Sequence, residues 1–303
     1  MQLRFLSPVI SRRSIVTSRW SPVIILVCST AVASIAGITD TSRASAQMFV
    51  AHRGASFDAP ENTLAAFQLA WQQGADAVEG DFYLSKDGQI VCIHDKTTKR
   101  TAGVELVVAD ATLDELKRLD VGRWKSEEFV GQRIPTLLEV LATVPQGKKI
   151  FIEIKCGPEI VEPLKTQLSQ CSLSSEQLVI ICFNRDVVTA AKQQLPNIKC
   201  QWLVSYDRDK DDGQWRPSLE SVLDTAEKIQ ADGIDTNANL DVVDERFVEQ
   251  LRDAELQFHC WTVNDPQVGV RMCTLGVDSI TTDRPLWLRE QLESSRESAA
   301  ASP

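Results

Sequence analysis

The sequence predicts an α/β fold, a (β/α)8 barrel with a small inserted subdomain after the second strand. Short apolar runs typical of strands alternate with amphipathic stretches typical of helices, and this order favours a parallel sheet with helical crossovers. Eight such strands close a barrel. The chain has 303 residues, and removing a predicted leader over residues 1–46 leaves 257. That length is close to the roughly 250 residues of a single barrel domain, which we place at residues 47–288.

The predicted strands are short runs of apolar, β-branched and aromatic residues. In chain order, the barrel strands are expected at residues 49–52, 77–84, 149–155, 178–183, 199–204, 233–236, 257–263 and 279–282. Amphipathic or helix-forming stretches between them predict helices at residues 64–73, 160–168, 187–195, 243–254 and 267–275.

A segment over about residues 96–135 interrupts this alternation. It follows a hairpin signal at residues 86–89 (KDGQ) and an extra strand at residues 90–94. Within the segment, residues 110–119 are typical of a short helix with Thr112 as its N-cap. We expect the leucine and valine residues of this insertion to pack against one another.

The candidate chemistry begins with histidines and spaced carboxylates. Two of the three histidines in the chain, His52 and His94, lie near the start of the predicted barrel. Glu79 and Asp81 stand two residues apart on the predicted strand 77–84, so their side chains project from one face. Two acids on one face of a buried strand repel each other unless a positive charge, such as a divalent cation, lies between them. This combination indicates metal-assisted acid/base hydrolysis of a phosphate ester.

A third acid, Glu153, lies on the predicted strand 149–155, and Lys155 shares its face by the same alternation. Three carboxylates suit a hard ion, so we expect one divalent cation, Ca²⁺ or Mg²⁺, rather than zinc. Lys155 is interpreted as a phosphate contact or, alternatively, as a counter-ion that balances the acids. In a barrel the catalytic groups gather at the C-terminal ends of the strands, where these residues are expected to converge.

Seven motifs, in order, resemble those of the glycerophosphodiester phosphodiesterase family over nearly all of residues 49–288. The motifs are His52-Arg53-Gly54, Pro60-Glu61-Asn62-Thr63, Glu79-Gly80-Asp81, His94-Asp95, Glu153-Ile154-Lys155, Trp261-Thr262-Val263-Asn264 and Thr282-Asp283-Arg284-Pro285. The resemblance implies a (β/α)8 barrel that hydrolyses glycerophosphodiesters to sn-glycerol 3-phosphate and an alcohol. It implies that His52 and His94 are the acid/base pair and that Glu79, Asp81 and Glu153 bind the metal.

Other residues are assigned supporting roles. We expect Arg53 to help Lys155 neutralise the phosphodiester oxygens. Trp261 is interpreted as a wall of the ligand site, whereas His259, on the same strand face, is expected to be a satisfied core or barrel-wall histidine. Glu61 precedes the first helix, where capping is the ordinary role, but the resemblance places it near the site as a supporting residue.

The N-terminus predicts export. Residues 11–16 (SRRSIV) resemble a twin-arginine signal, and an uncharged stretch covers residues 20–39. Cleavage at the small-residue site after Ala46 would give a periplasmic or secreted protein without stable membrane association. The alternative is an uncleaved anchor, because the uncharged stretch is long enough to span a bilayer.

The net charge of the chain argues against some classes of binding partner. Without the leader the chain carries 27 basic and 41 acidic residues, a formal charge of −14. Such acidity argues against binding to nucleic acid or anionic lipid and favours a small, diffusing substrate. Residues 289–303 are rich in serine, alanine and charge, and we expect them to form a flexible C-terminal tail.

Two alternative functions remain beside the glycerophosphodiesterase reading. A lipid phosphodiesterase of the lysophospholipase D or sphingomyelinase D type would need an apolar mouth, and the acidic stretch at residues 207–213 argues against one. A non-catalytic glycerophosphodiester-binding protein would usually lack a catalytic group, whereas both histidines, all three acids and the lysine are present. The sequence therefore favours metal-dependent hydrolysis by histidine acid/base catalysis.

Overall fold

The computed structural model describes residues 47–300 of the chain, so the predicted leader lies outside the described residues. Within this range, no helix combines the length and the apolar character needed to cross a membrane.

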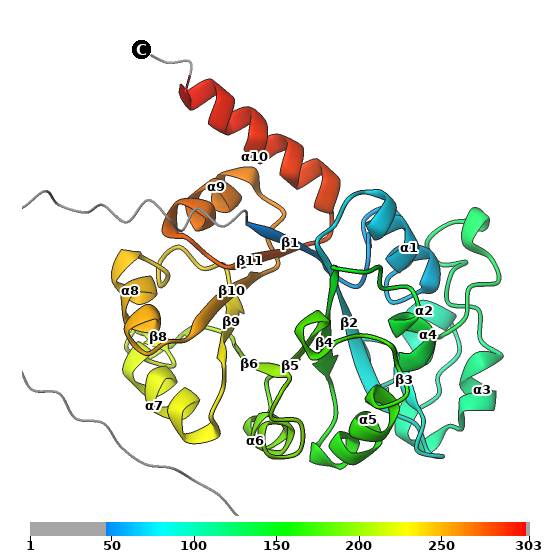
Figure 1. Ribbon diagram of the computed structural model, residues 1–303. Coiled ribbons are helices and arrows are strands. Elements are labelled where there is room, and N and C mark those ends of the chain that lie inside the picture. The colour runs from blue at the N-terminus through cyan, green and yellow to red at the C-terminus, as the bar shows by residue number, and fades with distance from the viewer. Residues whose placement is uncertain (1–46, 301–303) are drawn as a thin grey trace, which may run out of the picture. The chain divides into compact units, whose positions relative to one another are not determined.

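Eight parallel strands close into a barrel (Figure 1). They are β1 (Met48–Ala51), β2 (Ala77–Leu84), β4 (Lys149–Ile154), β5 (Leu178–Cys182), β6 (Lys199–Val204), β9 (Gly233–Asn237), β10 (Gln257–Trp261) and β11 (Ser279–Thr282). Closure comes from β1, which pairs in parallel with both β2 and β11. The predicted strands match these bounds within two residues, and the predicted fold class is confirmed.

Helices surround the barrel on the outside (Figure 1). They are α1 (Leu64–Gln72), α4 (Leu137–Leu141), α5 (Val161–Leu168), α6 (Arg185–Gln194), α7 (Leu219–Ile229), α8 (Glu245–Asp253), α9 (Pro266–Leu275) and α10 (Pro285–Ala300), with single 3-10 turns at Pro158–Ile160 and Ser175–Gln177. Helices α4, α7 and α10 were not predicted from the sequence. For α7 the sequence contains an N-cap residue, Ser218, whose side chain accepts a hydrogen bond from the Ser221 backbone N–H.

Each barrel strand contributes side chains to two layers, one inside the barrel and one between the strands and the helices, because alternate side chains point to opposite faces. In β4, Ile150, Ile152 and Ile154 join the large core between strands and helices. Phe151 faces the barrel interior, where it belongs to a small apolar cluster. Glu153 follows Phe151 by two residues and therefore also faces inward, which is how an apolar strand delivers a carboxylate to the barrel axis.

The insertion after β2 has its own small core. It begins with the predicted hairpin to β3 (Ile90–Cys92), which is antiparallel to β2. Its other elements are α2 (Lys99–Ala102), a 3-10 turn at Val108–Asp110, α3 (Leu113–Lys117) and a 3-10 turn at Glu127–Phe129. The buried residues that pack together in it are Val91, Ile93, Val108, Ala111, Leu116, Val121 and Ile134. Thr112 caps α3 as predicted, in a capping box with Glu115, but the helix is shorter than expected.

The C-terminal segment differs from expectation. Residues 289–300, expected as part of a flexible tail, instead continue α10. Leu288 and Leu292, four residues apart on one face, are buried, and the Arg289 guanidinium lies 4.4 Å from the centre of the Phe49 ring. The tail prediction rested on the polar composition of this segment, but the apolar i, i+4 pair stabilises α10 against the barrel.

The acidic stretch at residues 207–213 belongs to a small hairpin formed by the two-residue strands β7 (Asp207–Arg208) and β8 (Trp215–Arg216).

A matched pair of glycines tests how closely the first turn approaches α1. Gly54 follows β1 with φ of 82°, and a Cβ there would lie 2.5 Å from the Ala66 carbonyl carbon. Gly74 has φ of 76°, but a Cβ there would meet nothing within 4 Å. We expect Gly74→Ala to lower the free energy of unfolding by about 1–2 kcal/mol through backbone strain alone. Gly54→Ala should lose about 1–3 kcal/mol more through overpacking. Urea unfolding measures both losses, and equal losses would contradict the close approach.

Candidate active site

Most of the predicted site residues line one cavity at the C-terminal ends of the barrel strands, and Asp81 and Glu61 contact its lining residues. The cavity has a volume of about 120 Å³. Its charged and titratable lining residues are His52, Arg53, Glu79, His94, Glu153, Lys155 and Asp235, and its aromatic lining residues are Phe183 and Trp261. Convergence at this end of the barrel follows from the topology, because parallel strands all end on the same side.

Three buried acids cluster at the cavity, and two of them, Glu79 and Glu153, line it. Glu79 and Asp81 lie on β2 and Glu153 on β4, and Asp81 is the register partner of Glu153. Each offers one carboxylate oxygen within 4.8 Å of the others. Glu79 Oε1 and Asp81 Oδ1 are buried without a hydrogen-bond partner. Carboxylate oxygens gathered this closely without hydrogen bonds fit a hard divalent cation.

The pKa values of the three acids are shifted in different directions. Burial, then the negative charges of Asp81 and Glu153, raise the pKa of Glu79 well above its ordinary value. Burial and then Asp81 raise the pKa of Glu153 to about 7. For Asp81 burial is also the largest influence, but Arg53 and Lys155 outweigh it and lower the pKa. Without a cation the group therefore carries less than its full negative charge near neutral pH.

Two basic side chains balance the acids. Lys155 Nζ lies 2.7 Å from Glu153 Oε1 and 3.4 Å from Asp81 Oδ1. Arg53 Nε lies 3.2 Å from Asp81 Oδ2, and the Arg53 backbone N–H donates to Glu79 Oε2 at 2.9 Å. In this structure both cations are counter-ions of the acids, and both also line the cavity.

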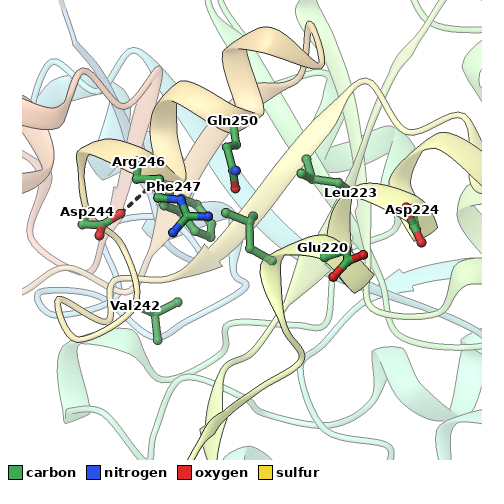
Figure 2. A pocket seen from close by; sticks show the side chains of 9 residues that line it. Glu220, Leu223, Asp224, Val242, Asp244, Arg246, Phe247 and Gln250 are labelled. Carbon is green, nitrogen blue, oxygen red and sulfur yellow. Dashed lines mark hydrogen bonds between the residues drawn. The ribbon is translucent and has the colours of Figure 1, made fainter.

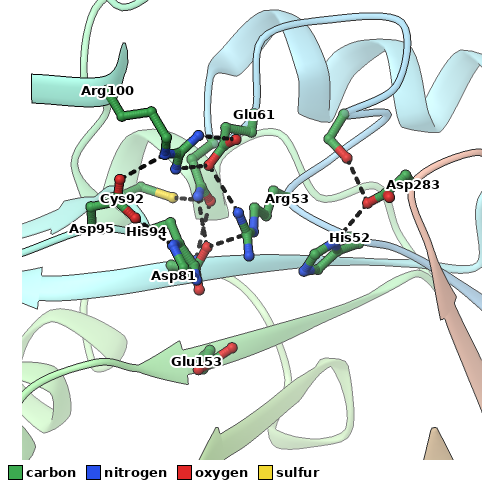
Figure 3. A network of polar contacts seen from close by, with 12 residues as sticks. His52, Arg53, Glu61, Asp81, Cys92, His94, Asp95, Arg100, Glu153 and Asp283 are labelled. Carbon is green, nitrogen blue, oxygen red and sulfur yellow. Dashed lines mark hydrogen bonds and ion pairs between the residues drawn. The ribbon is translucent and has the colours of Figure 1, made fainter. Parts of the chain in front are cut away.

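The loop after β1 supports this arrangement (Figure 3). Glu61 accepts hydrogen bonds from Arg53 at 3.0 Å and from Arg100 of the insertion at 2.7 Å, so it holds Arg53 instead of capping α1. Thr63 supplies the cap. Asn62 donates to Asp81 Oδ2 at 2.7 Å and accepts from the Asp81 backbone N–H at 3.1 Å.

Each candidate catalytic histidine is oriented by a carboxylate. His52 Nδ1 lies 2.6 Å from Asp283 Oδ1, and His94 Nδ1 lies 2.7 Å from Asp95 Oδ1 (Figure 3). The Asp95 carboxylate is shared with Arg100, whose Nε donates to it at 2.7 Å. Because Nδ1 of each ring is engaged, Nε2 is the nitrogen left to exchange a proton with a ligand.

The two carboxylates place their histidines in different electrostatic settings. Burial opposes ionisation of Asp283, but hydrogen bonds from His52, Asn264 and Ser56 together with the His52 charge lower its pKa to about 2. Burial is the main reason that the pKa of His94 lies below its ordinary value. A neutral ring is therefore favoured at His94, whereas Asp283 remains a fixed negative charge beside His52.

Trp261 and His259 lie in different surroundings. Trp261 lines the cavity, its Nε1 donates to the Asp235 carbonyl at 3.3 Å, and its ring contacts Phe183 edge to face at 5.7 Å between centres. His259 is buried and does not line the cavity, and its Nδ1 lies 2.7 Å from Ser279 Oγ. Its Nε2 is buried without a hydrogen-bond partner among the described residues, so the prediction of a fully satisfied histidine is wrong for this nitrogen.

Sequence reasoning missed four functional partners: Asp95, Arg100, Asp235 and Asp283. Asp95 and Asp283 stand within the quoted motifs, so their positions were visible but not their roles. Arg100 and Asp235 belong to none of those motifs, and only the folded structure brings them to the site.

A second hollow lies outside the barrel, between α7 and α8 (Figure 2). It has a volume of about 530 Å³, and its charged lining residues are Glu220, Asp224, Asp244 and Arg246. Asp244 is already used as the N-cap of α8. No histidine lines this groove, so it lacks the acid/base groups that the barrel cavity holds.

Comparison with known proteins agrees with this geometry. The chain matches the glycerophosphoryl diester phosphodiesterase family over residues 52–286. It is 36% identical over 245 residues to a glycerophosphodiester phosphodiesterase of Caldanaerobacter subterraneus subsp. tengcongensis, covering 78% of this chain and 94% of the relative. It is 32% identical over 252 residues to one of Bacillus altitudinis, covering 80% and 98%.

Solved structures give the same result. A phosphodiesterase of Oleispira antarctica, determined in complex with its product sn-glycerol-3-phosphate, has a TM-score of 0.73 at 30% identity and covers 81% of this chain and 96% of that one. A glycerophosphodiester phosphodiesterase of Thermotoga maritima has a TM-score of 0.65 at 27% identity, covering 80% and 97%. The chain therefore belongs to the glycerophosphoryl diester phosphodiesterase family, a family of phosphoric diester hydrolases.

Proposed function

We propose that this protein hydrolyses glycerophosphodiesters to sn-glycerol 3-phosphate and an alcohol by histidine acid/base catalysis at a divalent-cation site. The observation that carries the proposal is a single cavity lined by two carboxylate-oriented histidines, two basic side chains and two members, Glu79 and Glu153, of a cluster of three buried acids. Family membership supports the substrate class. The product bound to the Oleispira antarctica relative supports the identity of the released phosphate.

The cation would be held by Glu79, Asp81 and Glu153, with Ca²⁺ or Mg²⁺ suited to oxygen ligands. When bound, it would supply positive charge that stabilises the charge developing on the phosphoryl oxygens. Arg53 and Lys155 line the same cavity, so they bind the phosphate oxygens from the protein side.

We assign different proton roles to the two histidines. His94 accepts the proton of the attacking hydroxyl, because burial favours its neutral ring. The attacking hydroxyl belongs either to water, which gives the product directly, or to the glycerol moiety, which gives a cyclic phosphate that water then opens. His52, whose Nδ1 is held by Asp283, donates a proton to the leaving alcohol. Asp95 holds His94 and also pairs with Arg100.

We also propose export to the periplasm or the medium, with cleavage after Ala46. This proposal rests on the sequence of residues 1–46 alone.

The reaction is tested by release of sn-glycerol 3-phosphate from glycerophosphocholine by purified residues 47–303. We expect release with Ca²⁺ or Mg²⁺ and its loss in EDTA, because the three acids hold the ion that neutralises the phosphate. An enzyme-coupled assay for glycerol 3-phosphate measures the rate. Absence of release with either ion would refute the substrate class, and undiminished release after exhaustive chelation would refute the metal role.

The proton roles are tested with two leaving groups. His52→Ala should slow hydrolysis of glycerophosphocholine by about 10²–10⁴-fold. The same variant should lose much less on a glycerol p-nitrophenyl phosphodiester, because p-nitrophenolate leaves without a proton. His94→Ala should lose equally on both substrates, because the attacking hydroxyl is the same. Steady-state kinetics give the two ratios, and the opposite pattern would exchange the assigned roles.

The acid cluster predicts an unusual pH dependence of stability. Glu153 has a pKa raised from 4.5 to about 7, so the folded protein keeps a proton that the unfolded chain has lost. The metal-free protein should therefore lose stability, on the order of 3 kcal/mol, as pH rises through that window. Thermal unfolding at a series of pH values measures the loss, and saturating Ca²⁺ or Mg²⁺ should diminish it. Glu153→Gln is the control, and an unchanged loss in this variant would contradict the assignment.

A further inference from the structure

Asp235 is a buried acid in the cavity wall that the proposed mechanism does not use. It lies on β9, its side chain is 1% exposed, and it lines the same cavity as His52 and Lys155. Its Oδ1 atom is buried without a hydrogen-bond partner in the described part of the protein. A buried polar atom left unpaired costs stability, so its retention needs an explanation.

Neither a metal nor an ion pair accounts for Asp235. Asp235 is not a member of the cluster of acids whose carboxylate oxygens lie within 4.8 Å of one another. No basic side chain of the described residues lies within ion-pair distance of Asp235. Burial, and then the charge of Glu153, raise the pKa of Asp235 well above its ordinary value.

The surroundings of Asp235 differ from those of the phosphate-binding residues. Its register partner on β6 is Leu203, which lines the cavity together with Ile181 of β5. Trp261 lies against the same strand, because its Nε1 donates to the Asp235 carbonyl. This side of the cavity therefore offers apolar contacts and one unpaired carboxyl, whereas Arg53 and Lys155 offer positive charge.

We propose that the Asp235 carboxyl binds a hydroxyl group of the glycerol moiety of the substrate. This inference rests on the proposed function and deepens it. A phosphate oxygen would be repelled by an ionised carboxyl, and it would find stronger partners in Arg53 and Lys155. A hydroxyl group both donates and accepts, so it pairs with a carboxyl in either protonation state. The apolar neighbours would contact the carbon atoms of the same moiety.

Binding of two phosphate esters tests this inference. The ligands are sn-glycerol 3-phosphate and n-propyl phosphate, which lacks both hydroxyl groups, measured by titration calorimetry with saturating Ca²⁺ or Mg²⁺. The unmodified protein should prefer sn-glycerol 3-phosphate. Asp235→Leu should weaken sn-glycerol 3-phosphate roughly tenfold and leave n-propyl phosphate within about twofold, because one buried hydrogen bond is lost. Asp235→Asn should keep most of the preference, since an amide also pairs with a hydroxyl.

Thermal stability and a control variant at a neighbouring residue distinguish a ligand-binding role of Asp235 from a structural role. Asp235→Leu should raise the thermal midpoint, because it removes an unpaired buried polar group, whereas a structural carboxyl would give a lower midpoint. His259→Gln changes the register partner of Asp235 on β10, outside the cavity lining, and should leave the ligand preference unchanged.

Equal weakening of both ligands by Asp235→Leu, or no weakening, would overturn the inference. So would failure of the unmodified protein to prefer sn-glycerol 3-phosphate. Ligand binding and turnover are measured in separate experiments, so the proposed function and the proposed role of Asp235 can be refuted independently. A protein with the preference but no hydrolysis would refute the function alone, and hydrolysis with a preference that survives Asp235→Leu would refute only the role of Asp235.

Discussion

Mutual repulsion among three buried carboxylates is the constraint on which the rest of the site depends. Glu79, Asp81 and Glu153 are each at most 9% exposed and bring their oxygens within 4.8 Å of one another. Such a group is unstable in a folded protein unless positive charge compensates it. Arg53 and Lys155 supply part of that charge, and the orphaned oxygens define where a cation would supply the remainder.

The same constraint explains the unusual backbone of the loop after β1. Arg53 and Asn62 both have φ of 56°, a left-handed conformation that non-glycine residues seldom adopt. This conformation accompanies hydrogen bonds from the Arg53 backbone N–H to Glu79 and from the Asn62 side chain to Asp81. Local strain at this loop is thus offset by the stabilisation of two buried acids, as is common at functional sites.

Barrel closure completes the histidine geometry. His52 follows the first strand and Asp283 follows the last, 231 residues apart, yet β1 and β11 are neighbours in the sheet. The insertion contributes in a different way, because Arg100 joins Glu61 of the first loop to Asp95 beside His94. The network through Arg100 therefore connects the residue that orients His94 with the loop that balances the acids, whereas Asp283 holds His52 in a separate set of contacts.

The sequence by itself determined the fold class and the composition of the site. Alternation along β2 and β4 is a property of neighbouring residues, so it placed Glu79 with Asp81 on one face and Glu153 with Lys155 on one face without knowledge of the fold. Only the tertiary structure decided that Asp283 orients His52, that Glu61 holds Arg53 and that Asp235 shares the cavity. It also showed that α10 has a buried face, although the composition of this segment is polar. The contact of Glu61 with Arg53 spans only eight residues but depends on the fold of the loop after β1. The contact of Asp283 with His52 joins segments far apart in the chain, and its distance is set by the closure of the barrel, which no local periodicity encodes.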